Sequence, residues 1–171
     1  MSAANRIFIS YRHEEPWIDM ARNFGRKLRN YRVEWKLQSF IDERDIVVGD
    51  PWRASVNGAL ANCSHFLCLL CDSYWESTEC RRELDSALAR RAQGQSVRVL
   101  FVLLEPMKPE YLSLNDEGKP IGDVSKVGDF HFLGPFDKNG RRVPLNQWAA
   151  QQWSDPIEEM LTRLERTLAK T

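Results

Sequence analysis

The chain has 171 residues, 43% of them hydrophobic, and its 24 Lys and Arg residues balance its 24 Asp and Glu residues. This length and hydrophobic content suit one globular domain over 1–171 and argue against a disordered chain. The balanced charge, and basic clusters without interleaved aromatic residues, indicate that the protein does not bind nucleic acid directly.

The start of the chain, MSAANRIFIS, lacks the basic, apolar and cleavage regions of a signal peptide, and the longest apolar runs are too short to cross a bilayer. We therefore expect a cytoplasmic protein with no membrane partner. Cys68 and Cys71 form a CxxC pattern inside a predicted strand, where residues three apart point to opposite faces, so buried thiols are expected. His13, His65 and His131 lack ligand spacing, so no metal site is predicted.

The first elements in chain order are a strand and a helix. RIFISY, at 6–11, is a continuous apolar run of strand length. Pro16 then suits the first turn of a helix, and apolar residues recur at helical spacing from Trp17 to Tyr31. A second strand is predicted within 33–41.

A charged loop, DERDIVVGD, follows at 42–50 and precedes a second predicted helix. Asp50 can cap this helix and Pro51 fits its first turn. The apolar stripe of the helix consists of Trp52, Val56, Ala59, Leu60 and Cys63.

Strands at 65–71 and 97–104 are predicted next, both apolar enough to be buried on two faces. The segment 105–150 is irregular and rich in Gly and Pro, with an edge strand expected within 129–136. A last helix is predicted over 155–169. Alternating strands and helices imply an α/β protein with an open parallel sheet covered by helices on both faces.

One acidic residue stands out in SYWESTECRREL, at 73–84. At about 100° per residue, Cys80, Leu84, Ala87 and Leu88 form the buried stripe of a helix, and Glu83 lies on the border of that stripe. No cation lies three or four residues from Glu83 to form an ion pair within the helix. Because ligands of open parallel sheets bind beyond the carboxyl ends of the strands, Glu83 is a candidate for binding or stabilising positive charge. A structural ion pair with Arg12 or Arg44 is the alternative.

Three stretches in order, RIFISYR, FIDERDIVVGDPW and SHFLCLLCDSYWESTECRREL, resemble the successive boxes of the Toll/interleukin-1 receptor (TIR) domain family. The resemblance covers roughly 5–104, and the final helix is consistent in position. It implies a flavodoxin-like sheet of about five strands. The chain departs from the family pattern at Glu79, where the family usually has Trp, and in a longer turn into the strand predicted within 33–41.

The family includes assembly scaffolds and enzymes that cleave NAD at the nicotinamide–ribose bond. In the enzymes, the glutamate of the third box is catalytic, and it matches Glu83. The resemblance therefore implies an NAD glycohydrolase of the prokaryotic-immunity type, active in antiviral or cell-death defence when self-assembled. NAD is then the substrate and no cofactor is expected. The product, ADP-ribose or a cyclic form, and a fused or separate sensor module are left open.

The resemblance also implies roles for residues beyond Glu83. Ser10, Tyr11 and Arg12 would line the dinucleotide site, together with Asp42, and Arg12 would contact the diphosphate. Trp52 matches an aromatic position that lies against nicotinamide, although its spacing also fits a core residue. The loop would form a contact between subunits through Arg44, Asp45, Ile46 and Gly49.

Two other functions fit the sequence. One is a TIR scaffold without enzymatic activity, which acts through contacts between TIR domains. The other is an enzyme similar to nucleoside deoxyribosyltransferases, which also use a glutamate at an N-glycosidic bond. The retained Glu83 favours an enzyme, and the loop at 42–50 favours a TIR domain.

Overall fold

The computed structural model describes residues 6–31, 52–106, 131–141, 143–148 and 152–168. Within these ranges the strands are β1 (Ile7–Ser10), β2 (His65–Leu70), β3 (Arg98–Leu103) and β4 (His131–Gly134). The α-helices are α1 (Trp17–Tyr31), α2 (Trp52–Asn62), α3 (Thr78–Ala92) and α4 (Ser154–Leu168), and η1 (Asp72–Tyr74) and η4 (Leu145–Gln147) are short 3₁₀ helices.

The described strands form one parallel sheet in the order β1-β2-β3-β4. Four predicted strands are confirmed, including the edge strand within 129–136, which is β4. The strand predicted within 33–41 lies outside the described residues. A flavodoxin-like sheet has the strand order 2-1-3-4-5. When the second strand in sequence is left out, the order is 1-3-4-5, which corresponds to β1-β2-β3-β4 in the described residues.

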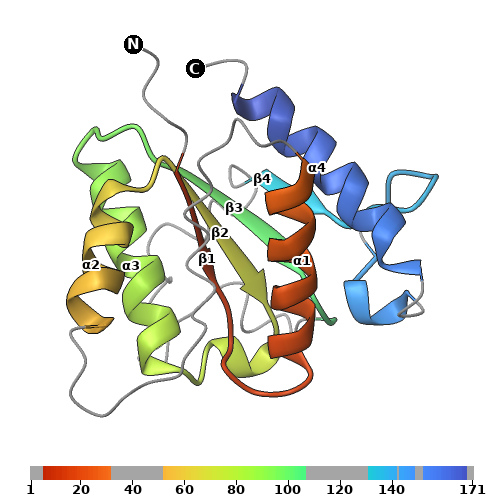
Figure 1. Ribbon diagram of the computed structural model, residues 1–171, viewed down its shortest axis with the longest axis horizontal. Coiled ribbons are helices and arrows are strands. Elements are labelled where there is room, and N and C mark those ends of the chain that lie inside the picture. The colour runs from red at the N-terminus through yellow and green to blue at the C-terminus, as the bar shows by residue number, and fades with distance from the viewer. Residues whose placement is uncertain (1–5, 32–51, 107–130, 142, 149–151, 169–171) are drawn as a thin grey trace.

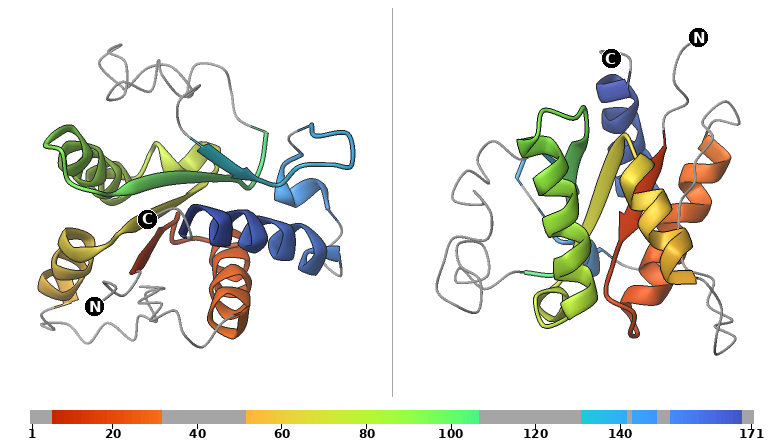
Figure 2. Two further views of the ribbon diagram at one scale, coloured as in Figure 1. Left: turned by 90° about the horizontal axis from the view of Figure 1, so that it is seen from above. Right: turned by 90° about the vertical axis from the view of Figure 1, so that its left-hand side faces the viewer.

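Helices cover both faces of the sheet, as predicted. Figure 1 shows α1 and α4 on one side of the strands and α2 and α3 on the other, and Figure 2 shows the same layers in two further views. The contacts agree, because α1 packs on α4 and α2 packs on α3. None of the helices in the described ranges is both long enough and apolar enough to span a membrane.

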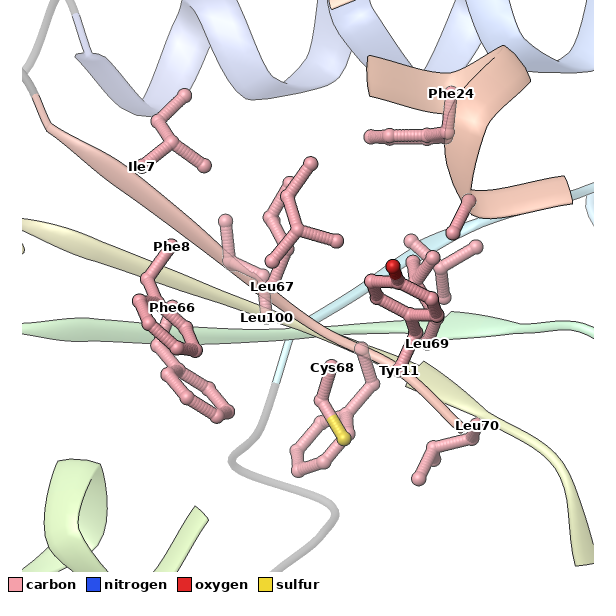
Figure 3. Packing of buried hydrophobic residues seen from close by; sticks show 14 of the residues in the cluster. Ile7, Phe8, Tyr11, Phe24, Phe66, Leu67, Cys68, Leu69, Leu70 and Leu100 are labelled. Carbon is pink, nitrogen blue, oxygen red and sulfur yellow. The ribbon is translucent and has the colours of Figure 1, made fainter. Parts of the chain in front are cut away.

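Two hydrophobic layers arise from the alternation of side chains along the strands. In Figure 3, Ile7 and Tyr11 lie on the side of α1 and α4, whereas Phe8 and Phe66 lie on the opposite side, toward α3. The rings of Phe8 and Phe66 are stacked with their centroids 5.6 Å apart. Every residue of β2 is buried, because both faces of this strand are covered.

Helix α3, which carries Glu83, is anchored at both ends. At its start, the Ser77 hydroxyl accepts a hydrogen bond from the backbone N–H of Cys80 at 3.2 Å, which is an N-cap. Near its end, the Arg90 guanidinium donates to the carbonyl oxygens of Leu60 (2.7 Å) and Cys63 (3.1 Å), at the end of α2. The Arg90 bonds fix the end of α3 against α2, whereas the Ser77 cap stabilises the first turn of α3 itself.

Candidate active site

The candidate site lies at the carboxyl ends of β1 and β2. Because the two strands are parallel, their carboxyl ends meet at one edge of the sheet, with Ser10 beside Cys68 in the register. Helix η1 follows β2 after one residue, Cys71, and α3 begins four residues after the end of η1. Two segments distant in sequence, the end of β1 and the stretch from β2 to α3, thus converge at this edge, as expected for an open parallel sheet.

Glu83 is the acidic side chain that this arrangement buries, with 8% of its surface exposed. Cys80, Leu84 and Ala87 form the buried stripe of α3 as predicted, Leu88 is only partly buried against the core, and Glu83 lies beside the stripe. The hydroxyl of Ser10 donates a hydrogen bond to Oε2 of Glu83 at 2.6 Å. A short bond from a hydroxyl to a carboxylate is among the stronger hydrogen bonds in proteins and fixes the rotamer of the carboxylate.

Tyr74 adds a second hydroxyl to the site, which sequence reasoning missed. Its oxygen lies 2.8 Å from Oγ of Ser10 and 3.2 Å from the carbonyl oxygen of Cys80, to which it can donate. Tyr74 is fully buried, with its ring edge-on to that of Trp75. An aromatic residue just after a buried strand looks like core, so the sequence signal for its polar role is weak: only its place at the strand end hints at it.

The thiols and the phenol around Glu83 are held in their neutral forms. Burial raises the pKa of Cys80 to about 12 and that of Cys71 to about 11. Burial likewise raises the pKa values of Cys68 and Tyr74 well above their ordinary ranges. The charge of Glu83 adds to this effect at Cys80, Cys68 and Tyr74. A thiolate is the reactive form of cysteine, so these thiols are poor candidates for a nucleophile.

Arg12 lies at the rim of the site. Its guanidinium forms a 3.3 Å ion pair with Glu14, and the two side chains are 29% and 43% exposed. The pKa of Glu14 is lowered by a hydrogen bond with Ser73 and by one with Arg12. The ion-pair partner that the structure shows for Arg12 is Glu14. Arg44, the other cation considered for Glu83, lies outside the described residues.

Glu79, one turn before Glu83, is paired with a cation of its own helix. Its Oε2 lies 2.8 Å from the guanidinium of Arg82, and both side chains are 43% exposed. The negative charge of Glu79 is thus partly balanced, and the solvent screens it from Glu83.

None of the remaining predicted site residues is seen with its side chain beside Glu83 in the described part of the structure. The Tyr11 side chain is 2% exposed, stacks on His13 and lies on the face of the sheet opposite Phe8. Its backbone carbonyl nevertheless reaches the site, where it accepts a bond from the thiol of Cys80 at 3.3 Å. Trp52 is the first residue of α2, and its side chain lies outside the described part of the structure. The same holds for the predicted loop residues Asp42, Arg44, Asp45, Ile46 and Gly49.

A metal centre has no support in the described ranges, where no group of three or more His, Cys, Asp and Glu side chains is placed to hold an ion. The four cysteines are buried free thiols. The described part of the site brings together a buried carboxylate, two neutral hydroxyls and a nearby guanidinium. Such a set can bind hydroxyl groups and stabilise positive charge.

Comparison with known proteins supports the family assignment. The model of the TIR domain family matches residues 7–130, more than half of the chain. Among solved structures, the TIR domains of the activated Roq1 resistosome, which directly recognises the pathogen effector XopQ, match with a TM-score of 0.56 and 15% identity. The match covers 94% of this chain and 99% of that one.

A conserved protein from Enterococcus faecalis has a TM-score of 0.48 and 11% identity, over 94% of this chain and 99% of that one. The comparison with curated proteins finds no match. The Roq1 match shows the same fold, and the family model covers both the strand that carries Ser10 and the helix that carries Glu83. The chain therefore belongs to the TIR domain family.

Proposed function

We propose that the protein is an NAD glycohydrolase that cleaves the bond between nicotinamide and ribose, with Glu83 as the catalytic residue. The observation that carries this proposal is the position of Glu83, which is buried at the carboxyl ends of the strands and held by a 2.6 Å bond from Ser10. In the enzymes of the family that this chain resembles, the glutamate of the same box is catalytic.

The reaction suits a single carboxylate. The bond between C1 of the ribose and the nicotinamide nitrogen breaks, and both electrons leave with nicotinamide, which departs as a neutral molecule. The leaving group needs no general acid, unlike the leaving group of an ordinary glycoside. Positive charge builds up on the ribose, so a fixed carboxylate that bonds the ribose hydroxyls stabilises the transition state more than the substrate. Water then adds to C1, loses a proton and gives ADP-ribose; attack by the adenine gives a cyclic product instead.

The remaining parts of the substrate have candidate partners. Arg12, at the rim, is suited to the diphosphate, which would compete with Glu14 for the guanidinium. Ser10 acts through Glu83, and Tyr11 contributes its backbone rather than its side chain. From the family resemblance, we also propose that Trp52 lies against nicotinamide and that Asp42 lies near the dinucleotide.

We further propose that the protein works in cytoplasmic defence and is activated by self-assembly. The support is the likeness to TIR domains of an activated resistosome that recognises a pathogen effector. A sensor module, fused or separate, would supply the trigger. The same likeness favours the second candidate function, a scaffold that acts through contacts between TIR domains without cleaving NAD.

Replacement of Glu83 by Gln tests the enzymatic proposal against the scaffold. Gln keeps the shape of the side chain and an oxygen that can accept from Ser10, but it removes the charge. We expect Glu83→Gln to reduce nicotinamide release from NAD by at least ~100-fold, as when a charge-stabilising group is removed from an active site. The measurement is free nicotinamide over time at high protein concentration.

The matched control is Glu158→Gln on α4, where the exposed carboxylate pairs only with Lys27 at 3.7 Å among the contacts described for it. This variant should retain wild-type turnover. Near wild-type turnover in Glu83→Gln would remove Glu83 from catalysis. A wild-type protein that releases no nicotinamide but binds other TIR domains would be a scaffold.

A further inference from the structure

Three polar side chains form a continuous chain in the interior. The hydroxyl of Tyr74 is 2.8 Å from that of Ser10, which is 2.6 Å from Oε2 of Glu83. At its other end, the Tyr74 hydroxyl is 3.2 Å from the carbonyl oxygen of Cys80. Tyr74 and Ser10 are 0% and 1% exposed, so solvent cannot replace the bonds between them.

Each hydroxyl has one proton to donate, so the chain can run in either direction; the Tyr74 hydroxyl also has the thiol of Cys68 as a hydrogen-bond partner. When Glu83 is ionised it can only accept, so Ser10 donates to Glu83 and Tyr74 donates to Ser10. When Glu83 is protonated, it can donate to Ser10, Ser10 donates to Tyr74, and Tyr74 donates to the carbonyl of Cys80. No hydroxyl proton is left without an acceptor in either arrangement.

We propose that Tyr74 and Ser10 are positioning residues for Glu83, joined to it in a hydrogen-bonded chain that reverses its direction when Glu83 gains or loses a proton. When Tyr74 donates to Ser10 and Ser10 donates to Glu83, both O–H dipoles point toward the carboxylate. Hydrogen bonds to an ion are stronger than those between neutral groups, and bonds in series strengthen one another. The chain therefore favours the ionised form of Glu83 and fixes its rotamer.

The groups packed around the chain keep their charge state while Glu83 titrates. Burial holds the pKa of Cys68, on β2, and that of Tyr74 well above their ordinary ranges, and that of Cys80 at about 12. Arg12, after β1, is a permanent cation whose charge acts on Cys80. On α3 itself, Glu79 is paired with Arg82.

The kinetic consequence of the chain rests on the proposed cleavage of NAD. If ionised Glu83 stabilises the cationic transition state, loss of the Tyr74 hydroxyl should lower kcat while KM changes little, because the Tyr74 hydroxyl lies behind Ser10 rather than beside Glu83 itself. We expect kcat of Tyr74→Phe to fall about tenfold, corresponding to about one lost hydrogen bond. The acid limb of the pH–rate profile should move to higher pH.

A measurement that needs no activity tests the chain itself. The side-chain carboxyl of Glu83 is followed by ¹³C NMR as a function of pH in the full chain, and Glu83→Gln identifies its signal. Tyr74→Phe should move the midpoint of this titration upward by about half a unit to one unit, and Ser10→Ala should move it further because the direct donor is lost. Either variant decides the question if the other does not fold.

Ile157→Val is the control for general loss of stability. Ile157 lies in the core on α4, and the change lowers stability by removing one buried carbon without touching the hydrogen-bonded chain. Its titration midpoint should equal that of the wild type. Unchanged midpoints in Tyr74→Phe and Ser10→Ala, or an equal shift in Ile157→Val, would overturn the proposal. Shifted midpoints in a wild-type protein that releases no nicotinamide would support the chain and overturn NAD cleavage.

Discussion

His65 is a buried ionisable residue that should link the stability of this protein to pH. It is 1% exposed, and its Nε2 has no hydrogen-bond partner among the described residues. Burial, and then the charge of Arg98, lower the pKa of His65 from 6.5 to about 4. The folded protein therefore holds His65 neutral, while the unfolded chain takes up a proton as the pH falls below about 6.5.

The contribution of His65 to the free energy of unfolding should accordingly be present above pH 6.5 and be lost as the pH falls toward 4. Between pH 7.5 and pH 5, the His65 contribution to the free energy of unfolding should fall by about 2 kcal/mol. Urea unfolding at the two pH values measures this fall in the free energy of unfolding. In His65→Gln, the part of the fall that comes from His65 should vanish. His13→Gln, at an exposed position, should keep the full loss. Equal losses in wild type and His65→Gln would refute the assignment.

At the scale of elements, the start of α3 determines where Glu83 lies. The cap by Ser77 satisfies the N–H of Cys80, one turn before Glu83. Ser77→Ala should lower the free energy of unfolding by about 1 kcal/mol, and Ser77→Asp should retain most of it, because Asp is also a good N-cap. Chemical denaturation gives these values.

Ser86→Ala is the matched control within α3. Ser86 lies in the middle of the helix, where Ala is the better helix former, so this variant should be neutral or slightly stabilised. A loss in Ser86→Ala as large as that in Ser77→Ala would show that the effect does not come from the cap.

At the scale of the whole molecule, the proposed assembly predicts that activity depends on protein concentration. Charged residues around the apolar IVV sequence at 46–48 suit a contact between subunits. Light scattering and nicotinamide release, recorded on one dilution series, should rise together. Ile46→Asp and Gly49→Val should suppress both while leaving the monomer folded. Loss of oligomers with undiminished turnover would contradict activation by assembly and leave the role of Glu83 intact.

The sequence by itself determined the parallel α/β architecture and the helical face on which Glu83 lies. Continuous apolar runs predicted β1, β2 and β3, and helical periodicity predicted the buried stripe beside Glu83. These features are local, because burial on one or both faces imposes a period of 3.6 or a continuous apolar run on neighbouring residues. The period of two in strands also accounts for Tyr11, since adjacent residues Ser10 and Tyr11 must point to opposite faces.

Only the tertiary structure decided which groups surround Glu83. Ser10 and Glu83 are 73 residues apart, and Ser10 and Tyr74 are 64 apart. Nothing in the local pattern of either segment specifies these pairs. They follow from the register of β1 on β2 and from the anchoring of α3 over the end of β1, which depend on packing across the whole core. Tyr74 looks like an ordinary core aromatic in the sequence, and its hydroxyl acquires a function only because the fold brings Ser10 within 2.8 Å of it.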